Sequence, residues 1–84
     1  MVKVLYFARL RELLGTAGES IELPAGVSTV GALRSYLLSR GGAWSDALAE
    51  GRAVRIAVNQ EMAQPTTPIG PNDEVAFFPP VTGG

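Results

Sequence analysis

Cysteine and histidine are both absent from this chain of 84 residues. Without cysteine the chain can form no disulfide, no thiol nucleophile and no thiolate metal site. Without histidine it lacks the commonest general base and the commonest metal ligand. We therefore expect no metal site and no bound cofactor, and we do not expect the chain to be an enzyme by itself.

Charge of one sign is also lacking, because seven basic residues stand against eight acidic ones for a net charge of −1. This balance predicts no nucleic-acid partner and no anionic membrane surface. No apolar run approaches the ~20 residues of a membrane helix. The apolar start is interrupted by Lys3, unlike a secretory signal, in which the charge precedes a longer apolar run. We expect a cytoplasmic protein.

The length suits one domain, and a hydrophobic content of 46% is ordinary for a globular chain. Strands are predicted where β-branched and aromatic residues cluster or alternate with polar ones, at 2–7, 18–23, 54–58 and 74–78. Turns are predicted at 59–61 and 71–73. A short helix at 8–14, closed by Gly15, follows the first strand, and a longer one starts at Ser28 or Thr29.

One or two further helical turns are expected at 44–48, before Gly51. Strands and helices are mixed without regular alternation, which favours an α+β fold. A chain this short can cover one face of a sheet with a helix or two, but not both faces. We divide it into a domain over residues 1–78 and an extended tail over 79–84, which Pro79 and Pro80 separate from the last strand.

Strand alternation assigns side chains to two faces of the expected sheet. Charged residues identify the solvent-exposed face: Lys3, Arg55 and Glu74. The same alternation places Leu5, Phe7 and Phe78 on that face, with Met62 near its rim. Exposed apolar residues on a small domain indicate a partner surface. The alternative is that the helix at 8–14 folds over part of this face.

The chain ends with Val81-Thr82-Gly83-Gly84. Glycine has no side chain, so such an end can enter a narrow channel and bend there. A carboxylate becomes reactive when ATP converts it to an acyl adenylate, and a sulfur nucleophile can then displace AMP and leave a thiocarboxylate on Gly84. A terminal glycine hinders that attack least and has no stereocentre to racemise. The alternative is a frayed terminus without function.

The last residues, from Asp73-Glu74-Val75-Ala76-Phe77 to Phe78-Pro79-Pro80-Val81-Thr82-Gly83-Gly84, resemble the C-terminus of the small subunit of molybdopterin synthase. Val4-Leu5-Tyr6-Phe7-Ala8 and Val58-Asn59-Gln60 resemble the first strand and the third strand with its turn in that family. The resemblance spans the chain from first strand to last residue and is weakest over 28–53.

This resemblance implies a β-grasp fold, as in ubiquitin, in which one main helix packs on one face of a mixed sheet. It implies that an adenylyltransferase related to ubiquitin-activating enzymes uses ATP to adenylate Gly84. A persulfide donor would supply the sulfur. The thiocarboxylate would donate it to cyclic pyranopterin monophosphate within the large synthase subunit, which holds the catalytic residues. Two small and two large subunits would form the assembly.

By position in the family motif, Gly84 is the residue that bears sulfur. Gly83, Thr82 and Val81 would line the route into the partner. Phe7, Met62 and Phe78 would form the partner-binding patch, which we call the docking surface. Three other interpretations remain open: a carrier for transfer-RNA thiolation or thiamine synthesis, a protein modifier that forms isopeptide bonds through Gly84, and a passive ubiquitin-like interaction domain.

Overall fold

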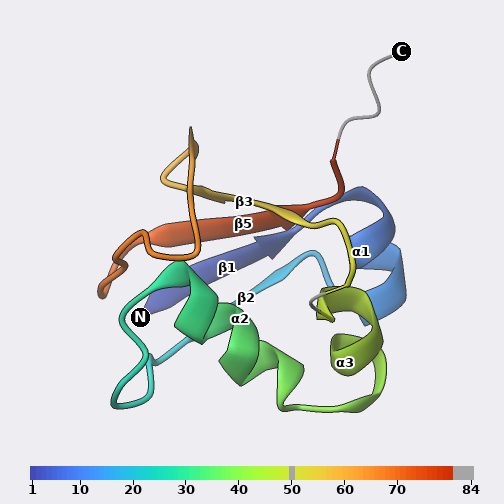
Figure 1. Ribbon diagram of the computed structural model, residues 1–84, viewed down its shortest axis with the longest axis horizontal. Helices are drawn as coiled ribbons and strands as arrows, with labels where there is room; N and C mark the ends of the chain where they lie inside the picture. Colours follow the sequence, from blue (N-terminus) through green and yellow to red (C-terminus); the bar gives the residue numbers. More distant parts are fainter. Residues whose placement is uncertain (50, 81–84) are drawn as a thin grey trace.

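The computed structural model describes residues 1–49 and 51–80. In this part of the chain the strands are β1 (Val2–Tyr6), β2 (Gly18–Ile21), β3 (Arg55–Val58), β4 (Glu61–Met62) and β5 (Glu74–Phe78). The helices are α1 (Ala8–Leu14), α2 (Val30–Leu38) and α3 (Gly42–Leu48). Figure 1 shows the three helices beside one twisted sheet. The prediction of an α+β fold is confirmed.

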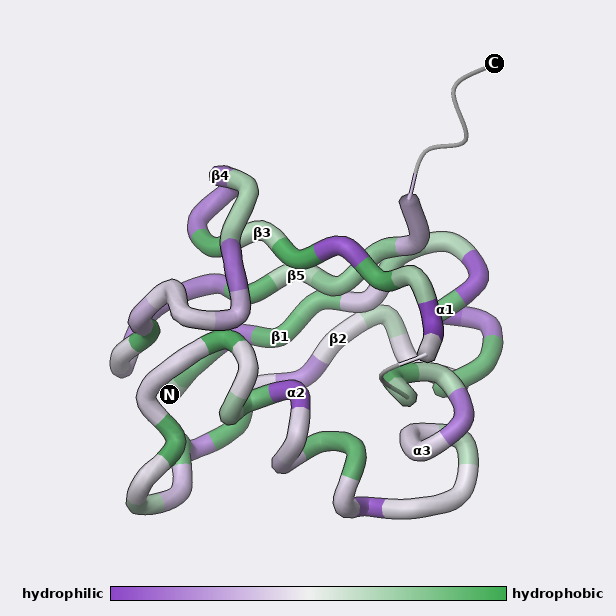
Figure 2. Tube along the Cα trace, viewed as in Figure 1, coloured by the Kyte–Doolittle hydropathy of each residue, from purple (hydrophilic) through white to green (hydrophobic). Residues whose placement is uncertain are grey.

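The strands form one sheet in the order β2-β1-β5-β3-β4. β1 and β5 are parallel neighbours, with Val4 opposite Val75 and Tyr6 opposite Phe77. The pairs β1–β2, β3–β5 and β3–β4 are antiparallel, so the sheet is mixed. The first and the last strand are therefore adjacent at its centre, and Figure 2 shows hydrophobic residues along both.

Helix α2 covers one face of the sheet. Its Val30, Leu33 and Leu37 recur at helical spacing and are buried in one core cluster with residues of β1 and β5. The helix begins as the sequence predicts, because the Thr29 hydroxyl accepts a hydrogen bond from the Ala32 backbone N–H at 3.2 Å.

Several predicted boundaries are wrong by one or two residues, for reasons that lie in the partner strands. β2 ends at Ile21 rather than Leu23, because Ile21 already pairs with Val2 at the start of β1. β3 begins at Arg55, whose partner Phe78 ends β5. The residue after Phe78 is Pro79, which has no N–H to pair with Val54.

Helix α1 does not cover the face of the sheet opposite α2. Its Leu10 is buried in the same core cluster as Ala47 and Leu48 of α3, so α1 packs toward the helical side. Phe7 and Met62 keep 47% and 59% of their surface exposed. The alternative in which the 8–14 helix folds over the exposed apolar residues is therefore wrong.

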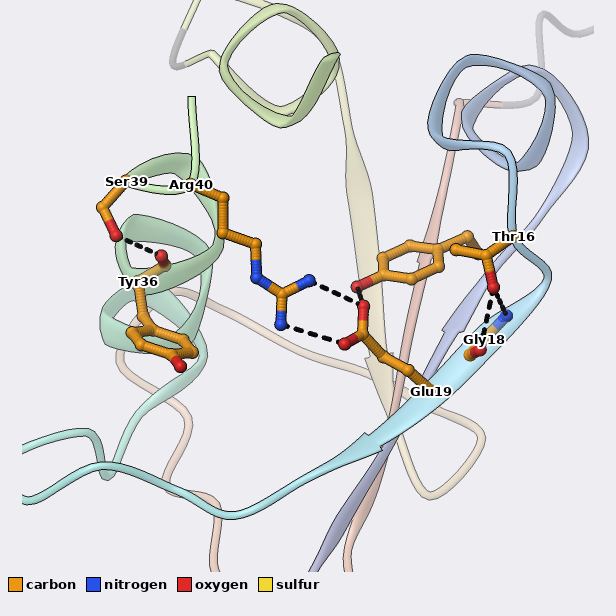
Figure 3. A network of polar contacts seen from close by, with 7 residues as sticks. Thr16, Gly18, Glu19, Tyr36, Ser39 and Arg40 are labelled. Carbon is orange, nitrogen blue, oxygen red and sulfur yellow. Dashed lines mark hydrogen bonds and ion pairs between the residues drawn. The ribbon is translucent and has the colours of Figure 1, made fainter. Parts of the chain in front are cut away.

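A polar cluster joins the helical layer to the edge strand β2. The Arg40 guanidinium donates hydrogen bonds of 2.8 and 2.9 Å to the two Glu19 carboxylate oxygens (Figure 3). The buried Tyr6 hydroxyl donates to the same carboxylate at 3.0 Å. The guanidinium also lies 4.6 Å from the centre of the Trp44 ring. The Arg40 hydrogen bonds hold the pKa of Glu19 below its ordinary value, and burial raises the pKa of Tyr6.

We predict that Glu19→Gln lowers the free energy of unfolding by about 1–2 kcal/mol at pH 7, because it removes charged hydrogen bonds. The pKa of Glu19 is lowered in the folded state. Its contribution is therefore complete above the ordinary pKa of ~4.3 and is lost as the pH falls through the lowered value. Urea unfolding as a function of pH measures the difference. A difference that stayed constant down to pH ~2 would contradict this account. Glu22→Gln, at an exposed site just after β2, is the control.

Candidate functional site

The face of the sheet opposite α2, which we call the open face, carries an apolar row across four strands. Leu5 on β1 pairs with Ala76 on β5, and Ala76 pairs with Ala57 on β3. Ala57 in turn pairs with Met62 on the edge strand β4. Charged residues flank this row: Lys3 pairs with Glu74 at one end of the face, and Arg55 pairs with Phe78 at the other.

The three residues of the docking surface belong to three different elements. Phe78 ends β5 and is half-buried, Met62 lies on β4, and Phe7 connects β1 to α1. Phe7 and Met62 are among the large apolar side chains that the described residues leave exposed. The predicted exposure is confirmed for Phe7 and Met62, Phe78 is half-buried, and contact of the three with a partner stays a prediction.

Backbone geometry holds Phe7 at the edge of the open face. Its N–H donates to the Phe77 carbonyl at 3.1 Å, and its own carbonyl accepts from the Leu10 N–H at 3.1 Å. The next residue, Ala8, has a φ of +51°, in the left-handed region. An L-residue pays roughly 1–2 kcal/mol there. The chain thus turns from strand to helix within one residue, which the sequence did not reveal because alanine gives no turn signal.

The tail begins at the same edge. Phe7 directly follows β1 and Phe78 ends β5. Because these two strands are parallel, both residues lie at the same end of the sheet. Pro79 and Pro80 come next and are outside any strand. The predicted functional residues of the tail lie outside the described residues: Val81, Thr82, Gly83 and Gly84. Figure 1 shows β5 ending beside α1.

Within residues 1–49 and 51–80, no group of acidic side chains is placed to hold a metal ion. In the same part of the chain, no helix combines the length and the apolar character that crossing a bilayer requires. What the described site does present is an apolar patch beside the point where the tail begins. Such a patch offers contact area for a partner close to the last residues of the chain.

A five-stranded mixed sheet with a central parallel pair, crossed on one face by one main helix, defines a ubiquitin-like β-grasp domain. The comparison with protein families then gives a more specific assignment. The ThiS family model matches residues 4–84, and the chain belongs to this family.

Individual relatives agree with that assignment. The molybdopterin synthase sulfur carrier subunit of Escherichia coli K12 is 46% identical, over 100% of both chains. The structure of a putative molybdopterin converting factor subunit 1 from Pyrococcus furiosus superimposes with a TM-score of 0.77 at 36% identity, covering 95% of this chain and 97% of that one. Small archaeal modifier protein 1 of H. volcanii gives a TM-score of 0.74 at 25% identity, covering 95% and 97%.

We predict that Ala8→Gly raises the free energy of unfolding by up to ~1 kcal/mol, because glycine adopts a positive φ without the Cβ penalty. Ala8→Val should lower it by about 1 kcal/mol or more. Chemical denaturation of both variants measures the two changes. If Ala8→Gly instead destabilised the protein by ~1 kcal/mol, as glycine does in a regular helix, the left-handed turn would be refuted.

Proposed function

We propose that this chain is the sulfur-carrier small subunit of a molybdopterin synthase. The observation that carries this proposal is the 46% identity to the Escherichia coli sulfur carrier subunit over the full length of both chains. An alignment of that extent includes the di-glycine end as well as the β-grasp domain. The accessible docking surface at the root of the tail supports the same function, because a carrier must bind each protein that acts on its end.

The reaction cycle follows from the chemistry of a terminal glycine. An activating adenylyltransferase consumes ATP, releases pyrophosphate and leaves the Gly84 carboxylate as an acyl adenylate. The terminal sulfur of a persulfide displaces AMP and forms an acyl disulfide with the donor. A thiol then attacks the donor-side sulfur, which breaks the S–S bond, releases the Gly84 thiocarboxylate and leaves a disulfide between the thiol and the donor. Because activation consumes ATP, we assign the cycle to the cytoplasm. ATP is a substrate of the activating enzyme, and the carrier needs no bound cofactor for these steps.

Sulfur transfer then takes place in the large subunit. The tail over 79–84 enters that subunit, where Val81, Thr82 and Gly83 line the route. The Gly84 thiocarboxylate donates its sulfur to cyclic pyranopterin monophosphate, and the catalytic side chains belong to the large subunit. Two small and two large subunits make up this assembly. The docking surface of Phe7, Met62 and Phe78 positions the carrier so that the tail reaches the reacting substrate.

The decisive experiment is the intact mass of the protein after incubation with ATP, an activating adenylyltransferase and a persulfide source. We expect a gain of about 16 Da, localised to Gly84, because sulfur replaces one carboxylate oxygen. A variant that ends at Gly83 should gain far less, because its reactive carboxyl is one residue short of the activating site. An unchanged mass, with an adenylyltransferase shown to act on a known carrier, would contradict the proposal.

The archaeal modifier with the same fold supports a second function to be tested in parallel, the attachment of Gly84 to other proteins. Both functions need the adenylate, so activation alone does not separate them. Peptide mass spectrometry of a cell extract supplied with ATP separates them. Gly84 joined to lysine side chains would favour the modifier, whereas sulfur on Gly84 with no such peptides favours the carrier.

The docking surface gives a prediction of its own. Phe7→Ser and Met62→Ser should each weaken binding to the large subunit by about 10-fold or more, because central apolar contacts carry most of the binding energy of an interface. Stability should change little for Met62→Ser, since this side chain is 59% exposed. Titration calorimetry and urea unfolding measure the two quantities. Gln60→Ser, at an exposed position in the β3–β4 turn, is the control. Unaltered affinity in both serine variants would exclude this surface.

A further inference from the structure

A groove lies beside the root of the tail and is not part of the docking surface. It has a volume of about 160 Å³ and lies between α1, the end of α3 and the segment that leads into β3. Two arginines, Arg9 and Arg52, are among the residues that line it, and the others are apolar: Leu10, Leu13, Val54 and Pro79, with two alanines. We call it the tail-root groove.

The groove is built by two well-defined elements. Arg9 and Leu13 are four residues apart on α1 and therefore lie on the same side of that helix. The opposite wall is fixed by Arg34 of α2. The Arg34 guanidinium donates to the carbonyls of Leu48 at 2.9 Å, Ala49 at 2.8 Å and Arg52 at 3.2 Å. Arg52 is thus presented by a segment whose backbone is tied to the main helix.

The composition of the groove indicates what it binds. Among its lining residues, all within the described part of the chain, there are two guanidinium groups and no carboxylate. The one ion pair found in the described residues joins Arg40 to Glu19 elsewhere. Leu13 lies on α1, away from the open face, and 45% of its surface is exposed. An apolar side chain of a partner can therefore contact it. Cationic walls around apolar surface are complementary to a carboxylate next to an apolar side chain.

We propose that the tail-root groove binds an acidic and apolar segment of the large subunit. A carboxylate of that segment pairs with Arg9 and Arg52, and a neighbouring apolar side chain covers Leu13. This inference rests on the proposed function, because it takes the large subunit as the partner. It deepens that function by assigning a charged contact to an interface that the docking surface alone would leave apolar.

Continuity with the docking surface identifies the large subunit as the occupant. Phe7 of the docking surface is two residues before Arg9, and Phe78 directly precedes Pro79 of the groove. Both therefore lie at the edge where β1 and β5 end, beside α1 (Figure 1). A protein that covers Phe7 and Phe78 and also takes in the tail would lie next to the groove, because Pro79 lines it.

The test compares Arg9→Gln, Arg52→Gln and the double variant with the unaltered protein. Affinity for the large subunit from the same organism is measured by calorimetry at low and at moderate salt. We expect the double variant to bind about 10-fold or more weaker at low salt, with a clearly smaller salt dependence, because a carboxylate loses both of its cationic partners. Arg11→Gln is the matched control, since Arg11 is exposed on the same helix but lines a different hollow. It should leave the affinity unchanged.

Other occupants of the groove give different results. If the double variant bound the large subunit as tightly as the unaltered protein, with the same salt dependence, the inference would be overturned. It would also be overturned if only binding to the activating adenylyltransferase weakened. Tighter binding by the double variant would mean that the chain's own terminal carboxylate occupies the groove, which likewise contradicts the inference.

The same samples separate this inference from the proposed function. Each variant is also incubated with ATP, the adenylyltransferase and the persulfide source, and its mass is measured. If the unaltered protein gains no sulfur and does not bind the large subunit, the proposed function fails. If it gains sulfur and binds, while the arginine variants match it in affinity, only the inference about the groove fails. Circular dichroism of every variant verifies that the fold is retained.

Discussion

The parallel pairing of β1 with β5 places the turn that holds Phe7 beside the point where the tail begins. It joins the first strand to the last at the centre of the sheet, with Val4 beside Val75 and Tyr6 beside Phe77. Parallel strands end at the same edge. The turn into α1 and the root of the tail are therefore neighbours, although more than sixty residues separate them in the sequence. The turn that holds Phe7, the tail-root groove and the start of the tail at Pro79 lie together because this pairing fixes them at one edge.

A second constraint is the size of the chain. With 84 residues, it has enough helix to cover one face of the sheet and leaves the other accessible. Stability is consequently concentrated on the helical side, where the core cluster lies and where Arg40 ties the end of α2 to β2. The open face contributes less to folding. The apolar side chains of the open face are therefore available to bind a partner without loss of the fold.

The sequence predicted the features that depend on local pattern. Alternation along the strands correctly separated Phe77 in the core from Phe78 on the open face, and residue type limited the helix cap to Ser28 or Thr29, of which Thr29 is the cap. Strand ends were less predictable, because the length of β2 is set by where β1 begins. The contacts of Arg34 and Arg40 join residues 14 to 21 positions apart. Nothing in the local sequence distinguishes Arg34 and Arg40 from arginines that point into solvent. Because Arg34 holds the segment that carries Arg52, the fold was needed to find the groove.

Specific recognition of this carrier has to come from its domain and not from its reactive end. A di-glycine terminus is chemically the same in any carrier or modifier that uses it, so an activated end alone cannot select a partner. The proposed apolar contact at Phe7 and Met62 would provide area, but apolar patches of similar size discriminate weakly between partners. Placed charges discriminate better, because a mismatched carboxylate or ammonium leaves a desolvated charge without a partner. Arg9 and Arg52 lie beside Pro79, so the charge pairing proposed for them would be made before the tail enters the partner.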